Sequence, residues 1–268
     1  MVHIFNINNG RRIKGVVSDL YHTLIYLGND PKAPPHAYYS PYTALLHDLG
    51  YNIKDAGFRE AEEIILTQNF SGFSELATKL KPDHRVRPER IKEHEMKVQK
   101  ALRDPKFFPD ERVPAALGFL RNKKYRLGII SNVSSPYKSA FYDSGLGLRN
   151  FIDESNCIFS CDTTEAFGRP MRKPDSYIYE EMCNKLGLEP EEILFVGNNL
   201  QMDYIGPRIM KSKAGIFEWK TASPDERRDM EKGGMHSVLV ARDGAYKSHT
   251  DVVKIDNFCK VLTCLDRR

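Results

Sequence analysis

The sequence lacks the features that define several classes of protein. No part of its 268 residues approaches the roughly 20 consecutive apolar residues that a membrane-spanning helix needs. Residues 1–15 read MVHIFNINNGRRIKG and have no apolar stretch behind a basic end, so we expect no secretory signal there. Cysteines number five, an odd count in a chain long enough to fold without disulfides. We therefore expect reduced thiols and a cytoplasmic protein.

A strong charge of one sign is also absent. The 40 Lys and Arg residues against 36 Asp and Glu residues give a net charge of +4, which is too small to indicate a nucleic-acid partner. Hydrophobic residues make up 41% and aromatic residues 10%, proportions that exclude wholesale disorder and collagen-like structure. We expect a small-molecule partner, phosphorylated or carboxylated, with no nucleic acid and no membrane. A homodimer is compatible with the sequence.

From residue 110 onwards, predicted helices and strands alternate along the chain. We expect helices over 110–122, 136–144, 175–186, 202–210 and 256–266, and strands over 14–19, 125–131, 157–160, 193–197, 214–217, 237–241 and 252–255. Alternation of this kind is typical of an α/β protein with a mostly parallel sheet and helices on both faces. The predicted fold class is therefore a doubly wound, Rossmann-like sheet.

A helical segment interrupts this pattern near its beginning. Residues 29–35 and 105–109 are rich in proline and resemble linkers, and between them we expect helices over 38–49, 55–69, 71–80 and 87–103. The predicted domains are an α/β core formed by residues 1–29 and 108–268, and an inserted all-helical domain formed by residues 30–107.

Polar side chains follow the predicted strands at the points where the strands end. Asp19 and Thr23 come after the first strand, Ser131 and Asn132 after the second, and Asn198 and Asp203 after a later one, while Lys173 stands just before a helix. In parallel sheets ligands bind at the carboxyl ends of the strands, so these residues are expected to share one crevice. A carboxylate can attack phosphorus or carbon, and hydroxyl and ammonium groups can neutralise the transferred group. Clustered carboxylate and amide oxygens suit Mg²⁺.

The order and spacing of four motifs resemble the haloacid dehalogenase-like (HAD) superfamily. The motifs read Val16-Val-Ser-Asp19-Leu-Tyr21-His22-Thr23, then Leu127-Gly-Ile-Ile-Ser131-Asn132, then Arg172-Lys173-Pro-Asp175, then Gly197-Asn198-Asn-Leu-Gln-Met-Asp203. The predicted helical insertion lies between the first and second motifs, where this superfamily inserts its C1-type cap.

The resemblance implies a role for each matched residue. Asp19 would be the nucleophile, with Tyr21, Thr23, Ser131 and Lys173 as further catalytic residues. Mg²⁺ would be held by Asp19, the backbone carbonyl of Tyr21, Asn198 and Asp203. Asn132, His22 and Arg172 would contact the substrate.

Two departures from the superfamily pattern leave three functions open. Tyr21 stands where the phosphatases of the superfamily carry the Asp that acts as general acid–base, and a tyrosine with a pKa of about 10 does this poorly. Asn198 replaces an acid of the fourth motif. Tyr21 resembles the haloacid dehalogenases, which need no metal, but Leu200 does not match the Asn that they carry. The leading hypothesis is Mg²⁺-assisted hydrolysis of a small phosphorylated metabolite. The alternatives are metal-free 2-haloacid dehalogenation, and a regulatory or metabolite-binding protein without turnover.

Overall fold

One parallel sheet forms the centre of the molecule. The computed structural model describes residues 12–27, 41–51, 61, 64–65, 70, 73–80, 87–103, 107–109, 112–133, 138, 140–143, 145–241 and 252–265. Within them, six strands pair side by side in the order β5-β4-β1-β6-β7-β8, every pair being parallel. Their bounds are β1 Gly15–Ser18, β4 Arg126–Ser131, β5 Cys157–Phe159, β6 Ile193–Gly197, β7 His236–Val240 and β8 Lys254–Ile255.

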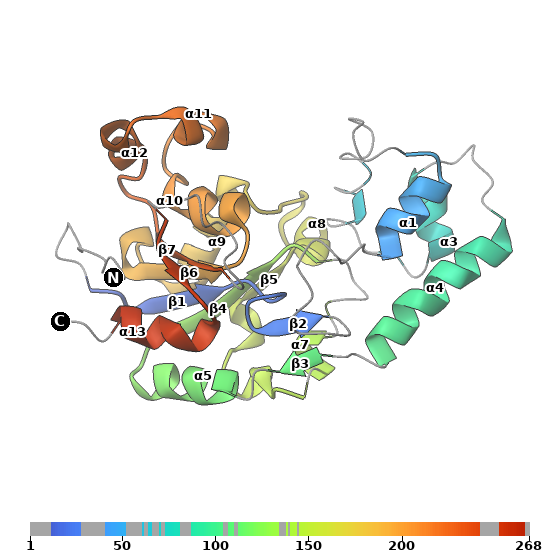
Figure 1. Ribbon diagram of the computed structural model, residues 1–268, viewed down its shortest axis with the longest axis horizontal. Helices are drawn as coiled ribbons and strands as arrows, with labels where there is room; N and C mark the ends of the chain where they lie inside the picture. Colours follow the sequence, from blue (N-terminus) through green and yellow to red (C-terminus); the bar gives the residue numbers. More distant parts are fainter. Residues whose placement is uncertain are drawn as a thin grey trace.

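Alternating side chains of the strands pack on the two faces of the sheet. In β1, Val16 belongs to the apolar cluster on one face and Val17 to the cluster on the other. Both faces are covered by helices. On one side lie α5 Arg112–Asn122 and α13 Val261–Leu265, and on the other lie α9 Ser176–Leu186 and α10 Gly206–Arg208 (Figure 1). The predicted α/β fold class is confirmed, because burial on both faces is what a doubly wound sheet requires.

A small antiparallel pair joins the two ends of the helical insertion to the sheet. β2 Ile25–Leu27 pairs with β3 Phe107–Pro109. We expected residues 105–109 to be a linker; for β3 this is wrong, since these three residues pair with β2. Pro109 is accommodated because it occupies the end of a short, two-stranded sheet.

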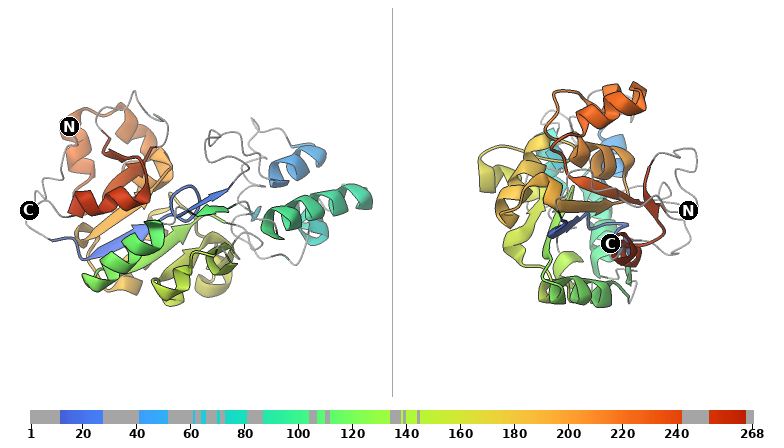
Figure 2. Two further views of the ribbon diagram at one scale, coloured as in Figure 1. Left: turned by 60° about the horizontal axis from the view of Figure 1, so that its bottom comes forward. Right: turned by 90° about the vertical axis from the view of Figure 1, so that its left-hand side faces the viewer.

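The insertion itself consists of helices that lie to one side of the sheet (Figures 1 and 2). Its described helices are α1 Pro41–Asp48, α3 Phe73–Leu80 and α4 Pro88–Arg103, close to the expected ranges. They enclose an apolar cluster of their own, which includes Leu45 and Leu76. Of the helix expected over 55–69, residues 61 and 64–65 are helical and the others lie outside the described residues.

The remaining described elements are short helices of three types. The short α-helices are α7 Ala140–Asp143, α8 Thr163–Phe167, α11 Ile216–Thr221 and α12 Pro224–Met230. The 3-10 helices span Leu148–Asn150, Glu154–Asn156, Ser160–Asp162, Pro190–Glu192 and Phe258–Lys260, and a π-helix spans Leu200–Ile205. The predicted helices over 202–210 and 256–266 therefore each begin with a non-α turn.

The strand expected over 214–217 is wrong, because residues 214–215 lie outside helices and strands and residues 216–217 begin α11. Ile216 and Trp219 lie three residues apart, so both face the same apolar cluster only if the backbone is helical. The Trp219 ring is buried there, and its Nε1 donates to Glu231 over 2.8 Å. A short apolar run such as 214–217 is compatible with either a strand or a helix. Over so few residues, the two-residue period of a strand cannot be distinguished from the 3.6-residue period of a helix.

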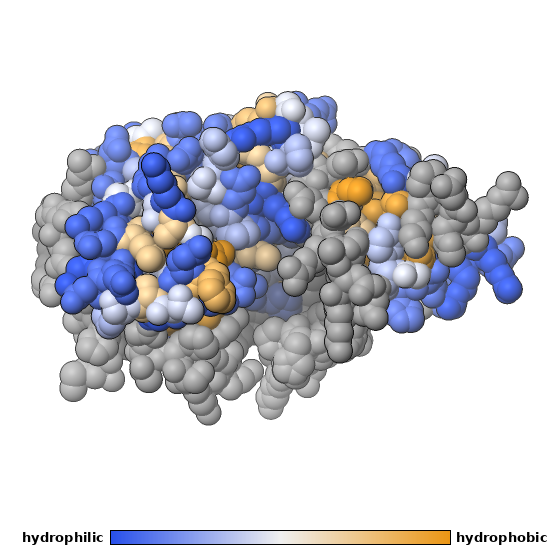
Figure 3. All heavy atoms as spheres, turned by 90° about the horizontal axis from the view of Figure 1, so that it is seen from above, coloured by the Kyte–Doolittle hydropathy of each residue, from blue (hydrophilic) through white to orange (hydrophobic). Residues whose placement is uncertain are grey.

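Two further findings concern the cysteines and the helices. None of the five cysteines forms a disulfide. Among the described helices, none has the length and apolar character needed to cross a membrane. On the face shown in Figure 3, hydrophobic patches are small and hydrophilic side chains separate them.

Candidate active site

The strand order brings the predicted site residues to one edge of the sheet. β1 lies between β4 and β6, so the residues after these three strands are neighbours. The backbone N–H of Asp19 continues the pairing by donating to the Val196 carbonyl over 2.8 Å. Asp19 therefore projects from the central strand, at the point where the chain connections diverge to the two halves of the sheet.

Lys173 lies at the centre of the site. Its Nζ is 2.7 Å from Asp19 Oδ1 and 2.6 Å from Asp203 Oδ1. All three side chains are buried, with residue exposures of 2% for Lys173, 7% for Asp19 and 1% for Asp203. Burial alone would lower the pKa of Lys173, but the two carboxylates outweigh it and raise the pKa of the ammonium. The structure thus holds a charged lysine between two buried acids.

Asp203 is fixed from the side opposite Lys173. Its Oδ2 accepts the backbone N–H groups of Asn198 over 3.0 Å and of Asn199 over 2.8 Å. A side chain at Gly197 would place its Cβ 2.3 Å from the Asp203 carboxylate, so only glycine allows this approach. Burial, with a smaller contribution from Asp19, raises the pKa of Asp203 to about 6, although Lys173 opposes the shift.

The two carboxylate oxygens of Asp19 differ in their surroundings. Oδ1 accepts the Ser131 hydroxyl over 3.1 Å as well as the Lys173 ammonium. Among the residues that the structure describes, none donates a hydrogen bond to Oδ2. The site therefore orients one oxygen with two donors and leaves the other available to a reacting atom.

The turn after β1 places the other residues of the first motif. Leu24 and Ile25 both donate backbone N–H groups to the Leu20 carbonyl over 3.0 Å, which closes the turn. Thr23 is fully buried within it. The ring of Tyr21 packs against the apolar cluster on the α5 face of the sheet. The catalytic role of Tyr21 stays a prediction.

His22 adopts a backbone conformation that glycine prefers. Its φ is 59°, in the left-handed region that costs a non-glycine residue about 1–2 kcal/mol. We expect His22→Gly to leave the free energy of unfolding unchanged or to raise it by up to about 1 kcal/mol, measured by urea denaturation. Lys124→Gly is the matched control, because Lys124 has a φ of 63° in an exposed turn away from the site.

The comparison of these two variants also tests a substrate role for His22. If the imidazole contacts substrate, His22→Gly lowers turnover and Lys124→Gly does not. A loss of stability beyond about 1 kcal/mol in His22→Gly alone would contradict the interpretation of backbone strain, because it would mean that the side chain is stabilising.

Asn132 and Arg172 are connected to Lys173 through its backbone. Asn132 Oδ1 accepts the N–H of Lys173 over 2.9 Å, and Asn132 Nδ2 donates to the Lys173 carbonyl over 2.9 Å. Arg172 precedes Lys173, and its carbonyl accepts the N–H of Asp175 over 2.8 Å. Of the residues that the sequence singles out, Asp19, Ser131, Lys173 and Asp203 contact one another directly, and Asn132 joins them through Lys173.

Two further groups at the site were missed by sequence reasoning. The backbone N–H of Asn199 binds Asp203, and the Tyr179 hydroxyl, which lies beneath the site, donates to the Met202 carbonyl. Burial raises the pKa of Tyr179 well above its ordinary value, with the nearby carboxylates adding to the shift. Tyr179 occupies a core position of α9, and nothing in the spacing of that helix distinguishes it from an ordinary apolar residue.

The donors for a metal ion at this site are few. The described residues contain no group of three or more His, Cys, Asp or Glu side chains placed to hold a metal. Asp19 and Asp203 supply two carboxylates, so a divalent cation here needs neutral oxygens as well. The carbonyl of Tyr21 and the amide of Asn198 are of the right chemical kind for Mg²⁺, which accepts few protein carboxylates.

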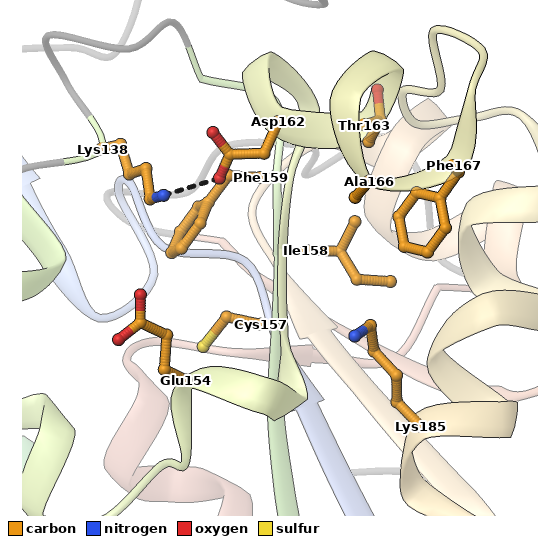
Figure 4. Close-up of a pocket in the computed structure, with 10 residues that line it drawn as sticks. All are labelled: Lys138, Glu154, Cys157, Ile158, Phe159, Asp162, Thr163, Ala166, Phe167 and Lys185. Atoms are coloured by element: carbon orange, nitrogen blue, oxygen red, sulfur yellow. Dashed lines mark ion pairs between the residues drawn. The ribbon is translucent and has the colours of Figure 1, made fainter.

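A separate cavity of about 170 Å³ lies along the open edge of β5 (Figure 4). Neither Asp19 nor Lys173 lines this cavity. An ion pair of 2.7 Å joins Lys138 to Asp162 at one end. Its lining residues are Lys138, Glu154, Cys157, Ile158, Phe159, Asp162, Thr163, Ala166, Phe167 and Lys185.

Comparison with known proteins now decides the family. A family model for haloacid dehalogenase-like hydrolases matches residues 13–208, which include all four motifs. The chain belongs to the haloacid dehalogenase-like hydrolases. The resemblance seen in the motifs is thereby confirmed, and the parallel sheet agrees with it.

The relatives of this hydrolase include a phosphatase and a haloacid dehalogenase, the two kinds of enzyme that the sequence left open. It is 31% identical over 121 residues to glyceraldehyde 3-phosphate phosphatase of Methanothermobacter thermautotrophicus, a match that covers 45% of this chain and 49% of that protein. It is also 31% identical over 124 residues to (S)-2-haloacid dehalogenase of Pseudomonas sp. strain YL, covering 44% and 49%. The chain spans about half the length of the curated relatives it matches.

A solved structure agrees with the fold. The structure of a HAD phosphatase from Thermococcus onnurineus superposes with a TM-score of 0.54 at 19% identity, covering 95% of this chain and 98% of that one. At this identity the match concerns the fold alone.

Proposed function

We propose that this HAD-like hydrolase cleaves phosphoesters of small metabolites with Asp19 as its nucleophile. The observation that carries the proposal is the arrangement around Asp19. Lys173 and Ser131 hold Oδ1, and Oδ2 has no hydrogen-bond donor among the described residues. A carboxylate fixed in this way presents one oxygen to an incoming phosphorus atom, and Lys173 reduces the repulsion between two anions.

The proposed reaction has two steps. Asp19 Oδ2 forms a bond to phosphorus while the ester P–O bond breaks, and the departing alkoxide takes a proton from water. Water then attacks phosphorus, the acyl phosphate P–O bond breaks, and inorganic phosphate leaves with Asp19 restored as a carboxylate. Ser131 and Lys173 stabilise the charge on the transferred group in both steps.

Mg²⁺ is part of this proposal. Asp19, Asp203, the Tyr21 carbonyl and Asn198 would hold it. When bound, the ion neutralises charge on the transferred phosphoryl group. Because Asn198 replaces a carboxylate, we expect weaker Mg²⁺ binding than at a site with three acids.

We also propose that the helical insertion, residues 30–107, acts as a cap that selects the substrate. Its described helices α1, α3 and α4 have a core of their own, and the paired strands β2 and β3 flank them in the chain. β2 directly follows the turn that carries Tyr21 and Thr23. Only a short segment therefore separates the helical insertion from Asp19, and a movement of the insertion would change the position of the nucleophile.

Metal-free displacement at carbon is the second candidate. It is favoured by Tyr21, which stands in place of the acid–base aspartate that phosphoester chemistry uses. It is also favoured by Lys173, whose ammonium offsets part of the charge of the two carboxylates without a metal ion. In this reaction Asp19 would displace halide from a 2-haloacid to form an ester.

A thermal-shift experiment separates the candidates. Beryllofluoride, which mimics a phosphorylated carboxylate, is expected to raise the melting temperature when Mg²⁺ is present, and Asp203→Ala is expected to abolish this shift. Halide release from 2-chloropropionate without Mg²⁺ would favour the second candidate. A protein that gives neither result, but is stabilised by a phosphorylated metabolite it does not hydrolyse, is a binding module.

Replacing Tyr21 tests whether the missing acid limits turnover. We expect Tyr21→Asp to raise hydrolysis of p-nitrophenyl phosphate by up to about 100-fold, the low end of general acid–base effects, because this leaving group needs little protonation. Tyr21→Phe is the control, since it removes the hydroxyl without adding an acid. Equal turnover in all three proteins would show that acid catalysis at this position is not what limits the enzyme.

A further inference from the structure

The loop that carries Lys173 is held by side chains, each of which binds both the backbone N–H and the backbone C=O of one residue. Asn132 binds the N–H and the C=O of Lys173, both over 2.9 Å. Thr163 Oγ1 accepts the N–H of Met171 over 2.8 Å, and its one hydroxyl proton is shared between the carbonyls of Met171 at 3.2 Å and Ser160 at 2.8 Å. Both contacts replace the backbone pairing that a strand would provide, because residues 168–175 lie outside helices and strands.

A third contact of the same kind closes a ring of hydrogen bonds. Ser160 Oγ accepts the N–H of Val133 over 2.9 Å and donates to the Val133 carbonyl over 3.0 Å. Thr163 Oγ1 also contacts the Ser160 carbonyl over 2.8 Å. The end of β4, the turn after β5 and the Lys173 loop are thus joined in a closed path that begins and ends at residues 132 and 133.

From this geometry we infer that Asn132 is a positioning residue for Lys173 and does not bind substrate. This inference rests on the proposed function, in which Lys173 orients Asp19. The Asn132 amide is already occupied: its oxygen accepts one N–H, and its nitrogen donates to a carbonyl and lies 3.5 Å from Met202 Sδ. Few donors or acceptors of this side chain remain for a substrate.

The position of the Lys173 backbone determines where its ammonium lies. Nζ meets Asp19 at 2.7 Å and Asp203 at 2.6 Å, so it has little freedom to compensate for a shift of its Cα. A displacement of about 1 Å at a catalytic group can lower turnover by about 100-fold. Asn132 therefore acts on the nucleophile through Lys173, from the neighbouring strand.

Three variants of the full chain test the inference. Asn132→Ala removes both hydrogen bonds to Lys173. Asn132→Asp keeps the acceptor for the Lys173 N–H but loses the donor to its carbonyl. Thr163→Ala is the matched control, because it removes the equivalent pair of bonds at Met171, two residues away.

The first measurement does not depend on activity. The ¹⁵N resonance of the Lys173 ammonium, assigned by its absence in Lys173→Met, reports the two carboxylate contacts. We expect this resonance to shift or broaden in Asn132→Ala and to stay in place in Thr163→Ala. An unchanged resonance in Asn132→Ala, or an equal change in both variants, would overturn the inference.

The second measurement is the kinetics on an aryl phosphate. We expect Asn132→Ala to lower kcat by about 10- to 100-fold with KM within about threefold, and Asn132→Asp to lie between Asn132→Ala and the unmodified protein. A raised KM with unchanged kcat would instead mean that Asn132 binds substrate. If the unmodified protein hydrolyses nothing, the proposed function fails, and the Lys173 resonance still decides the role of Asn132.

Discussion

Asp19→Asn is expected to lower hydrolytic turnover by at least about 10³-fold while the protein remains folded. An amide oxygen is a poor nucleophile, so no covalent intermediate forms at an appreciable rate. The fold is expected to persist because asparagine has the same shape, and its oxygen can still accept from Ser131 and Lys173. Phosphate release and the melting temperature, measured on the same preparation, check both parts.

Ser131→Ala provides a graded comparison for this result. It removes one hydrogen bond to Asp19 Oδ1 but leaves the nucleophile, so a smaller loss of turnover is expected. Full activity in a folded Asp19→Asn protein would contradict the assignment of the nucleophile, whichever substrate is used.

Lys173→Met is expected to destabilise the fold by about 3–5 kcal/mol at pH 8. The substitution leaves Asp19 and Asp203 facing each other in a buried site with no cation between them. Replacing Lys14, whose ammonium is exposed and pairs with Glu192 at 2.6 Å, is the control and is expected to cost at most about 1 kcal/mol. Urea denaturation measures both.

The pH dependence of the Lys173→Met protein follows from Asp203. Burial already raises the pKa of this carboxyl to about 6, above the value of about 3.9 expected in the unfolded chain, and the loss of Lys173 raises the pKa further. Since the folded state then binds the proton more tightly, stability increases as the pH falls through the folded pKa. Lys173→Met should therefore recover part of its loss between pH 8 and pH 5. A loss equal to that of Lys14→Met at every pH would contradict the buried charge cluster.

The sequence predicted the centre of the fold better than its periphery. The apolar runs at 14–19 and 193–197 are β1 and β6, and burial on both faces explains why such runs are continuous rather than alternating. The pair formed by β2 and β3 was missed because three-residue strands are too short to show a period. A strand was expected over 214–217, but a helix begins at Ile216, where Ile216 and Trp219 pack on the same apolar cluster.

The grouping of the candidate site residues could be predicted from one rule about parallel sheets. Residues that follow adjacent parallel strands lie close together at the carboxyl ends of those strands. Ser131 accordingly donates to Asp19, and Lys173 joins Asp19 to Asp203. The role of Asn132 could not be predicted in the same way. Its amide pairs with the backbone of a loop 41 residues later in the chain, and neither spacing nor residue type indicates that contact.

Hydrolysis in H₂¹⁸O, followed by mass spectrometry of both the product and the peptide that contains Asp19, tests the central claim most directly. Attack of water on an acyl phosphate at phosphorus puts ¹⁸O into the released phosphate and leaves Asp19 unlabelled, which is the predicted result. Attack of water on an ester of Asp19 at its carbonyl carbon, as displacement at carbon would require, puts ¹⁸O into the Asp19 carboxylate. Label in Asp19 after turnover would contradict phosphoester hydrolysis, and label in neither place after product release would contradict a covalent role for Asp19.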